Sequence, residues 1–413
     1  MTAPLTCTPA PEKPAHRDGN VLRWLGAYGA SMIGDNIYYV ALSWAAVQSG
    51  SPSQAGLVMA VSAAPRALLM LGGGVIADRI GPRRIVIGSD AVRSAAVLAV
   101  AGLFLATQPG LWPLTVLGLV FGIVDALFLP AVGALPARVT GRDQLARVQG
   151  MRGLAVRLAN VVGAPLGGLG VALGGPAAAF GAAGLLFAIS LPLLMSLRIR
   201  DLPDDGGKSG APARNGLADG LRYIRRHRVL APLVVVIALS DLGFVGPLNV
   251  GLTLLADQRG WGASGMGSVL AGFGVGAGAA SLLLAVRGRV PHAGLVLAAT
   301  MGGGAVAIGA LAFVPHLAAA VAVALVIGLL AGLSGALCGA LTQTHADPAY
   351  IGRVTAVTSL SSLGLVPLTM PLTGAAVGLW GTGPVFVASA AICALAGVYG
   401  LFRAPLRRAE LPA

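Results

Sequence analysis

The sequence predicts an all-α integral membrane protein with twelve transmembrane helices in two pseudo-symmetric six-helix bundles. Of the 413 residues, 56% are hydrophobic and 10% are charged, and the mean hydropathy is +0.83. Soluble domains carry about 25% charged residues, so this composition is typical of a membrane protein. Twelve apolar runs are each long enough to cross about 30 Å of hydrocarbon, and one long polar connection divides them six and six.

The apolar runs give the expected positions of the helices. We place them at 21–47, 55–77, 85–107, 112–137, 148–173, 177–198, 229–256, 263–286, 292–314, 316–341, 353–378 and 383–403. Residues 1–20 are expected to form a disordered cytoplasmic tail, because they are rich in Pro, Ala and Thr and lack the apolar core of a signal peptide. Residues 21–198 then form the N-terminal bundle, 229–403 the C-terminal bundle, and 404–413 a second cytoplasmic tail.

The basic residues predict how the chain lies in the bilayer. A net charge of +13 could indicate a nucleic-acid partner, but 24 of the 28 Lys and Arg fall in the tails and in alternate loops. The opposite loops hold only Arg259, and Arg66, Arg93 and Arg157 lie inside helices. Loops rich in Lys and Arg stay on the cytoplasmic side. We therefore expect a multi-pass protein of the cytoplasmic (inner) membrane with both termini in the cytoplasm and no nucleic-acid partner.

The polar connection at 199–228 is expected to be a cytoplasmic linker. Within it, residues 217–228 combine apolar residues at helical spacing with four Arg, which predicts a basic amphipathic helix on the inner membrane surface. The segment Gly207-Lys208-Ser209 is not a phosphate-binding loop, because Leu202 stands where that motif requires a Gly.

The two halves of the sequence repeat at an offset of 206 residues. Gly133-Ala134-Leu135 matches Gly339-Ala340-Leu341, and Arg147-Val148 matches Arg353-Val354. Parallel repeats of this kind are related by an axis along the membrane normal. The repeat therefore favours two equivalent bundles.

Polar residues in the apolar runs are the candidates for transport chemistry, because a charge at mid-bilayer costs roughly 2.5–3.5 kcal/mol. Those expected roughly 11–14 residues from the cytoplasmic end, about 16–21 Å in, are Asp35, Arg66, Asp125, Asn160 and Asp241. We expect Asp35, Asp125 and Asp241 to face a central cavity and one or more of them to carry protons. The alternative is that some are structural, bonded to a neighbouring helix or to Arg66.

Other polar residues are given different roles. Asn36 and the Tyr residues near it could line a substrate cavity. Asp90 and Arg93 are three residues apart, so they share a helix face and can pair, which favours a structural role. The three Cys and five His have no metal-ligand spacing, and no hydrolase motif is present, so neither a metal site nor an enzyme is predicted.

A short basic loop at 72–84 carries a family resemblance. The residues that carry it are Gly74, Asp78, Arg79, Gly81, Arg83 and Arg84. Their order resembles the G-x-x-x-D-R-x-G-R-R loop between the second and third helices of the major facilitator superfamily, with Pro82 where the family usually has its first basic residue. The resemblance implies twelve helices in two bundles and transport by alternating access.

The same loop, which we call the gating loop, is expected to hold the bundles together in the outward-open state. Asp78 would accept bonds from free N–H groups at the start of the helix near Arg353. Arg79, Arg83 and Arg84 would pair with acids such as Asp90.

A second resemblance concerns residues 160–168, which are similar to the antiporter motif G-P-x-x-G-G of the drug-efflux branch, with Ala164 in place of its first Gly. Proline and small residues predict a bending, closely packed helix here and in its counterpart in the second half. The residues concerned are Pro165, Gly167, Gly168, Pro371 and Gly374. Gly34-Asp35 and Asp90-x-x-Arg93 add a resemblance to bacterial drug and siderophore exporters.

These resemblances imply a proton-coupled exporter of small amphipathic molecules such as a drug, an antibiotic or a secondary metabolite. The expected partners are a small-molecule substrate, protons and the lipid bilayer, with the chain working as a monomer. The proton gradient is the expected energy source, with no cofactor. The alternatives are a siderophore exporter, an importer that works by proton symport or uniport, and a non-transporting membrane sensor.

Overall fold

A computed structural model describes residues 17–107, 109–141, 144–199, 213–287, 290–347 and 350–410. Within these ranges, the side chains of residues 70–75, 77 and 78 are among those left undescribed. The predicted tail at 1–20 therefore lies mostly outside the described residues, as does the first part of the linker.

The described residues form helices and no strands. The first bundle contains α1 (Gly19–Ser49), α2 (Pro52–Ile80), α3 (Pro82–Ala106), α4 (Trp112–Val139) and α5 (Leu145–Met195). The segment between the bundles contains α6 (Ala213–Arg226). The second bundle contains α7 (Leu230–Gly246), η2 (Pro247–Gly251), α8 (Leu252–Gln258), α9 (Gly262–Arg287), α10 (Ala293–Leu311), α11 (Leu317–His345), α12 (Ile351–Trp380), α13 (Thr382–Phe402) and the short α14 (Ala404–Arg407).

Helix α5 contains two of the predicted membrane-spanning helices. Gly174 and Gly175 leave helical geometry, and Gly175 has a φ of 67°, a left-handed conformation that favours glycine. Pro176 follows and starts the second arm, where its missing N–H costs nothing. The two arms correspond to the predicted helices at 148–173 and 177–198.

The predicted helix at 229–256 is also built differently from a plain α-helix. It consists of α7, α8 and the π-helical turn η2 between them. Such turns are often found at functional sites in helices. Together, α7, η2 and α8 form one candidate span of 29 residues, Leu230–Gln258.

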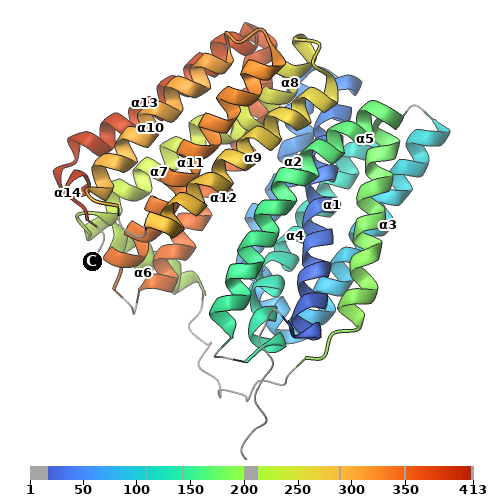
Figure 1. The fold of residues 1–413 in the computed structure, drawn as a ribbon, viewed down its shortest axis with the longest axis horizontal. Coiled ribbons are helices and arrows are strands. Elements are labelled where there is room, and N and C mark those ends of the chain that lie inside the picture. The colour runs from blue at the N-terminus through green and yellow to red at the C-terminus, as the bar shows by residue number, and fades with distance from the viewer. Residues whose placement is uncertain are drawn as a thin grey trace, which may run out of the picture.

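The described part of the chain confirms the predicted fold class. Nine of its helices are long and apolar enough to cross a membrane on length and composition alone. One of these is the double-length α5, and α1 and α2 are also long enough, at 31 and 29 residues. The described helices thus supply the twelve predicted spans in two bundles (Figure 1).

The two bundles lean together at one end and separate toward the other (Figure 1). We call the separated end, where α6 and the C-terminus lie, the linker end, and the opposite end the far end. Between the bundles, α2 packs along α12 and α5 packs along α9.

Two glycines predicted to be hinge residues allow this close packing at the far end. A Cβ atom on Gly168 of α5 would lie 2.3 Å from the carbonyl oxygen of Ala263, and one on Gly374 of α12 would lie 2.4 Å from that of Pro52. Only glycine fits so near a backbone atom of the other bundle. Here the helices touch backbone to backbone.

Polar side chains also join the bundles at the far end. The hydroxyls of Ser43 on α1 and Thr253 on α8 are 2.5 Å apart. Gln48 Nε2 donates to Asp257 Oδ1 at 2.6 Å. The structure is therefore closed at the far end and open at the linker end.

Helix α6 lies at the linker end and packs on α12 and α7 of the second bundle. Ile224 is buried, and the ring of Tyr223 stacks on that of Tyr350 with centroids 4.4 Å apart. Part of the apolar face of α6 therefore contacts protein, whereas Leu221 is half exposed. Contact of α6 with the membrane surface stays a prediction.

Candidate functional site

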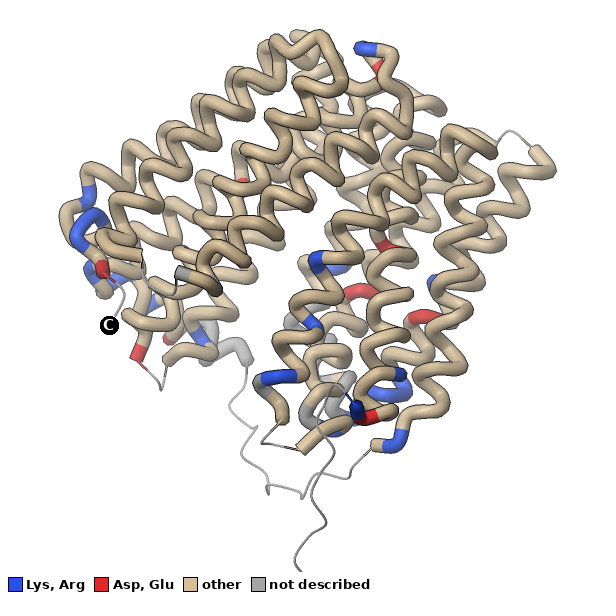
Figure 2. Tube along the Cα trace, viewed as in Figure 1, with Lys and Arg blue, Asp and Glu red and all other residues tan. Residues whose placement is uncertain are grey.

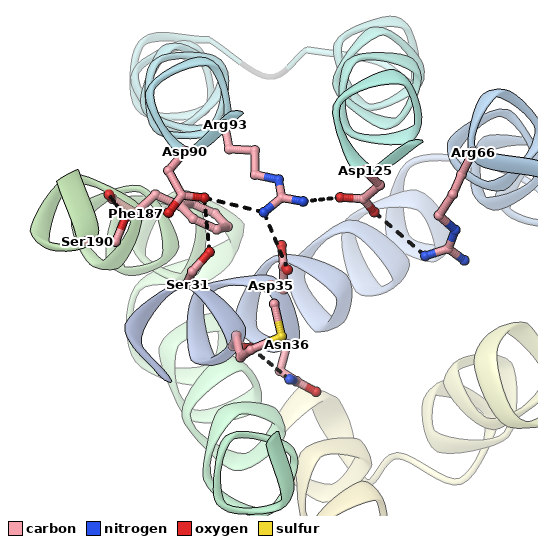
Figure 3. A network of polar contacts seen from close by, with 10 residues as sticks. Ser31, Asp35, Asn36, Arg66, Asp90, Arg93, Asp125, Phe187 and Ser190 are labelled. Atoms are coloured by element: carbon pink, nitrogen blue, oxygen red, sulfur yellow. Dashed lines mark hydrogen bonds and ion pairs between the residues drawn. The ribbon is translucent and has the colours of Figure 1, made fainter. Parts of the chain in front are cut away.

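A buried charge network lies inside the first bundle, and Arg93 of α3 is at its centre (Figure 3). Arg93 Nη1 is 3.7 Å from Asp35 Oδ2 on α1 and 3.4 Å from Asp90 Oδ1 one turn earlier on α3. Arg93 Nη2 bonds to Asp125 Oδ1 on α4. Three helices thus place three carboxylates around one guanidinium group.

Aromatic rings hold the guanidinium of Arg93 in place. Its Cζ atom lies 4.1 Å from the centroid of Phe128, 5.8 Å from that of Phe121 and 5.7 Å from that of Phe187. These are cation–π distances, and the side chain is 1% exposed. An arginine does not lose its proton in a protein, so Arg93 supplies a fixed positive charge.

The three carboxylates of the network differ in how well they are paired. Asp125 is shared by two arginines, since Arg66 Nη1 of α2 lies 3.6 Å from its second oxygen. Asp90 is fully buried and also accepts hydrogen bonds from Ser31 Oγ at 3.0 Å and Ser190 Oγ at 2.5 Å. Asp35 has one ion pair and is 24% exposed, compared with 17% for Asp125.

The charge network contains more carboxylates than guanidinium groups. Asp35, Asp90 and Asp125 face two guanidinium groups, so the group carries a net charge of −1 when all five residues are ionised. An uncompensated charge is costly in a low-dielectric interior. Binding one proton would make the network neutral.

Asn36 and Asn160 lie between the charge network and the second bundle. Asn36 Nδ2 donates to Asn160 Oδ1 at 3.1 Å and to the carbonyl of Met32 at 2.8 Å. Both amides line a cavity of about 240 Å³ between the bundles. Arg157, also on α5, lines it and donates to the carbonyl of Ala277 on α9 at 3.1 Å.

Asp241 of α7 lies apart from the other predicted acids. It lines a larger cavity, of about 560 Å³, formed inside the second bundle mainly by α7, α10, α11 and α12. Its Oδ2 atom is buried and has no hydrogen-bond partner among the described residues. The sequence predicted one central cavity for all three acids, whereas the structure brings Asp35 and Asp125 together and gives Asp241 a cavity of its own.

Two further features went unrecognised in the sequence. Arg93, expected to pair structurally with Asp90 alone, is the centre of the network. The second cavity has a row of hydroxyls from α12, namely Thr355, Thr358, Ser359 and Ser362. Their spacing of three and four residues puts them on one helix face, so a polar stripe in an apolar run was the available signal.

The gating loop makes other contacts than predicted. Arg83 Nη2 donates to the carbonyl of Met195 at 2.5 Å, while Arg79 and Arg84 are exposed. None of the three pairs with Asp90, whose described partners are Ser31, Ser190 and Arg93, so that prediction was wrong. Asp90 is fully buried inside the bundle, whereas Arg79 and Arg84 are exposed.

The predicted gating role of the loop stays a prediction. Gly81 has a φ of 93° and ends α2 with a left-handed turn that glycine favours. The surroundings of Gly74 and the side chain of Asp78 are not among the described features.

Four of the five predicted hinge residues lie where the bundles touch. The exception is Gly167 on the first arm of α5, which packs on α1 of its own bundle, where an added Cβ would lie 3.0 Å from Cβ of Val40. Gly267 on α9 approaches Pro165 closely in the same way, and Pro371 on α12 faces Gly56 of α2. The residues are thus close-packing residues, and their role as hinges stays a prediction.

Two bundles of membrane-spanning helices that meet at one end, with charged residues buried inside, have the architecture of a membrane transporter of the alternating-access type. Residues 24–366 match the family model of the Major Facilitator Superfamily. The chain belongs to this superfamily, and it is a transporter and not an enzyme.

Curated relatives of the chain are exporters. It is 28% identical over 409 residues to the multidrug efflux pump Tap of Mycobacterium tuberculosis (strain ATCC 25618 / H37Rv), covering 92% of each chain. It is 27% identical over 313 residues to the enterobactin exporter EntS of Escherichia coli O127:H6, covering 75% of this chain and 73% of the relative.

Solved structures share the fold at low sequence identity. A mutant of the nucleoside transporter NupG matches with a TM-score of 0.70 at 12% identity, covering 94% of this chain and 100% of that chain. A bacterial homolog of the human lysosomal transporter Spinster, in an inward-facing and occupied conformation, matches with a TM-score of 0.71 at 14% identity, covering 97% and 100%.

Proposed function

We propose that this protein exports small amphipathic molecules across the cytoplasmic membrane by proton antiport. The observation that carries the proposal is the buried network of three carboxylates and two arginines, which is one proton short of neutrality. The names of the relatives, a multidrug efflux pump and an enterobactin exporter, support export as the direction.

We place the linker end in the cytoplasm. Most Lys and Arg lie at this end (Figure 2), which the positive-inside rule favours. The structure would then be inward-open, with Gln48 and Asp257 closing the external side. Both termini would be cytoplasmic.

Asp35 is the proposed proton carrier. Asp125 is held by two arginines, and Asp90 by two hydroxyls and Arg93. Asp35 has the weakest pairing, at 3.7 Å, and is the most exposed of the three carboxylates. Its protonation removes the uncompensated charge at the smallest loss of ion pairing, which indicates one proton per transport cycle.

The neighbouring Asn36 supplies a route from Asp35 to the bundle interface. Asn36 bonds to Asn160 on α5, and α5 packs against α9 of the other bundle. Asp35 and Asn36 are consecutive on α1, so a shift of α1 on protonation moves both. Because Asn36 bonds to Asn160, a shift of α1 also displaces α5 at its contact with α9. This contact must rearrange when the external side opens.

The test is transport in inverted membrane vesicles with a panel of ethidium, a Hoechst dye and enterobactin. An imposed pH gradient, acidic inside, is expected to drive uptake of at least one compound in wild-type vesicles. Asp35→Asn should reduce this uptake to the level of vesicles without the protein, at equal abundance in the membrane. The matched control is Asp219→Asn, an exposed acid outside the network.

The outcome also separates the rival functions. Undiminished gradient-driven uptake by Asp35→Asn would remove Asp35 as the carrier, and uptake that needs no gradient would contradict antiport. Siderophore export, which the enterobactin exporter favours, predicts that enterobactin alone is taken up. An importer would move the compound out of these vesicles.

We also propose that one chain is the working unit, with no metal ion or cofactor and no nucleic-acid partner. The charge network comes entirely from one bundle, and both cavities are formed by this chain alone. The proton gradient would then supply all the energy for transport.

A further inference from the structure

The cavity of the second bundle has the size and lining of a site for a small organic molecule. Its volume of about 560 Å³ falls in the usual range for drug-sized ligands. It lies inside one bundle, apart from the charge network around Arg93 in the other. Apolar side chains form much of its wall, including Ile237, Phe244, Ile308 and Ile327.

Asp241 is the only charged residue among the described residues that line this cavity. Ser362 hydrogen-bonds to its carboxylate, and the buried Oδ2 atom has no partner in the described part of the chain. The described part of the lining contains no Lys, Arg or His that could neutralise it. A buried carboxylate without a cation is costly, so the cavity favours a ligand that brings a positive charge.

Apart from Ser362, the lining hydroxyls with described bonds have partners other than Asp241. Thr300 and Ser334 bond to each other at 2.8 Å, and each also bonds to a carbonyl of its own helix. Thr358 likewise donates to the carbonyls of Val354 and Thr355. These three hydroxyls thus have partners elsewhere, whereas Oδ2 of Asp241 has none in the described part of the chain.

We infer that this cavity binds an amphipathic organic cation, such as a protonated amine or a quaternary ammonium or phosphonium ion, with Asp241 as its counter-ion. The charge of the ligand pairs with Oδ2, and its apolar body packs on the aliphatic wall and on Phe244. The inference rests on the proposed export function, for which it names the substrate class. It places substrate and proton in different bundles.

Charge also decides against other ligands. An anionic ligand would meet Asp241 with no arginine or lysine in the described lining. A neutral ligand would bury the carboxylate further without compensating it. Each bundle instead holds one uncompensated negative charge, satisfied by a proton in the first and by an organic cation in the second.

The test is equilibrium binding of tetraphenylphosphonium to the purified full-length protein in detergent, with no proton gradient. We expect saturable binding by wild-type protein and, for Asp241→Asn, a loss of affinity of about 30-fold or more, as for removal of one partner of a buried charge pair. Triphenylphosphine oxide, a similar but neutral compound, should compete poorly. Asp219→Asn is the matched control and should bind as wild-type.

Two further variants keep the test decisive if Asp241→Asn fails to fold. Asp241→Glu keeps the charge and should retain binding. Gly335→Leu fills the cavity from a position where an added Cβ meets nothing within 4 Å, and it should abolish binding without changing the charge. Wild-type affinity in folded Asp241→Asn, or equal affinity for the neutral compound, would overturn the inference.

Failure of this inference can be told apart from failure of the proposed function. Antiport would stand if proton-driven uptake in vesicles is lost in Asp35→Asn. The cation site would be overturned, in the same experiments, if Asp241→Asn has no effect on tetraphenylphosphonium binding. Asp241-dependent binding without proton-driven uptake would overturn antiport and keep the site.

Discussion

At the residue scale, Arg93 determines how three acids can lie within one membrane bundle. Its guanidinium contacts Asp35, Asp90 and Asp125, and three phenylalanine rings surround it. Its fork of five N–H donors lets it reach carboxylates on three helices at once. One residue therefore compensates charge from α1, α3 and α4.

We predict that Arg93→Met destabilises the protein by about 3–5 kcal/mol, because removing one partner leaves buried charge uncompensated. Arg93→Lys should have a smaller effect, since an ammonium group keeps the charge but not the fork. Thermal unfolding in detergent is the measurement. Arg222→Met is the control, because its ion pair with Asp219 is exposed, and an unchanged melting temperature for Arg93→Met would contradict the prediction.

At the element scale, α5 is one of the two first-bundle helices, with α2, that join the halves most closely. It turns at Gly175 into two arms, and its first arm places Asn160, Pro165 and Gly168 against α9. The small residues let the backbones of α5 and α9 meet, so this contact is close and is made by backbone atoms. A tight contact that depends on a missing side chain is easily opened by adding one.

We predict that Gly168→Leu shifts the protein toward a conformation open at the far end. The added side chain would run into Ala263, since its Cβ would lie 2.3 Å from the carbonyl oxygen of that residue. The distance between spin labels at Thr107 and Phe313, exposed positions on different bundles, should increase in pulsed electron paramagnetic resonance. Gly181→Leu, where an added Cβ meets nothing within 4 Å, should leave the distance unchanged.

At the scale of the whole molecule, the charge network of the first bundle and the cavity of the second have the same net charge but different structures. Asp35 and Asp241 are 206 residues apart, which is the repeat offset of the sequence. The first lies in a network with arginines and the second in an apolar cavity. The charge network of the first bundle and the described lining of the second cavity each hold a net charge of −1 when ionised, so one proton and one monovalent cation neutralise them equally.

We predict that exchange of tetraphenylphosphonium for protons is electroneutral. In proteoliposomes, a pH gradient should drive uptake, because one proton replaces one monovalent cation. A potassium diffusion potential set with valinomycin should change the protein-dependent rate little, after subtraction of uptake by protein-free liposomes. A strong response to the potential would show unequal charge movement and contradict a one-for-one exchange.

The sequence by itself determined the class and the outline of this protein. Hydropathy alone gives the twelve spans, because a helix must satisfy its own backbone in lipid and needs about 20 apolar residues to cross it. The loop at 72–84 and the repeat at 206 identified the superfamily and its two bundles. The acids Asp35, Asp125 and Asp241 stood out because charge is costly in an apolar run.

Only the tertiary structure decided which of these residues act together. Asp90 was expected near the gating loop and lies instead in the network, since depth along a helix does not tell which neighbours its face meets. The separation of Asp241 from Asp35 likewise depends on how the bundles pack. Side-chain pairing across helices is set by helix rotation and crossing, and these are fixed by contacts between residues far apart in the chain.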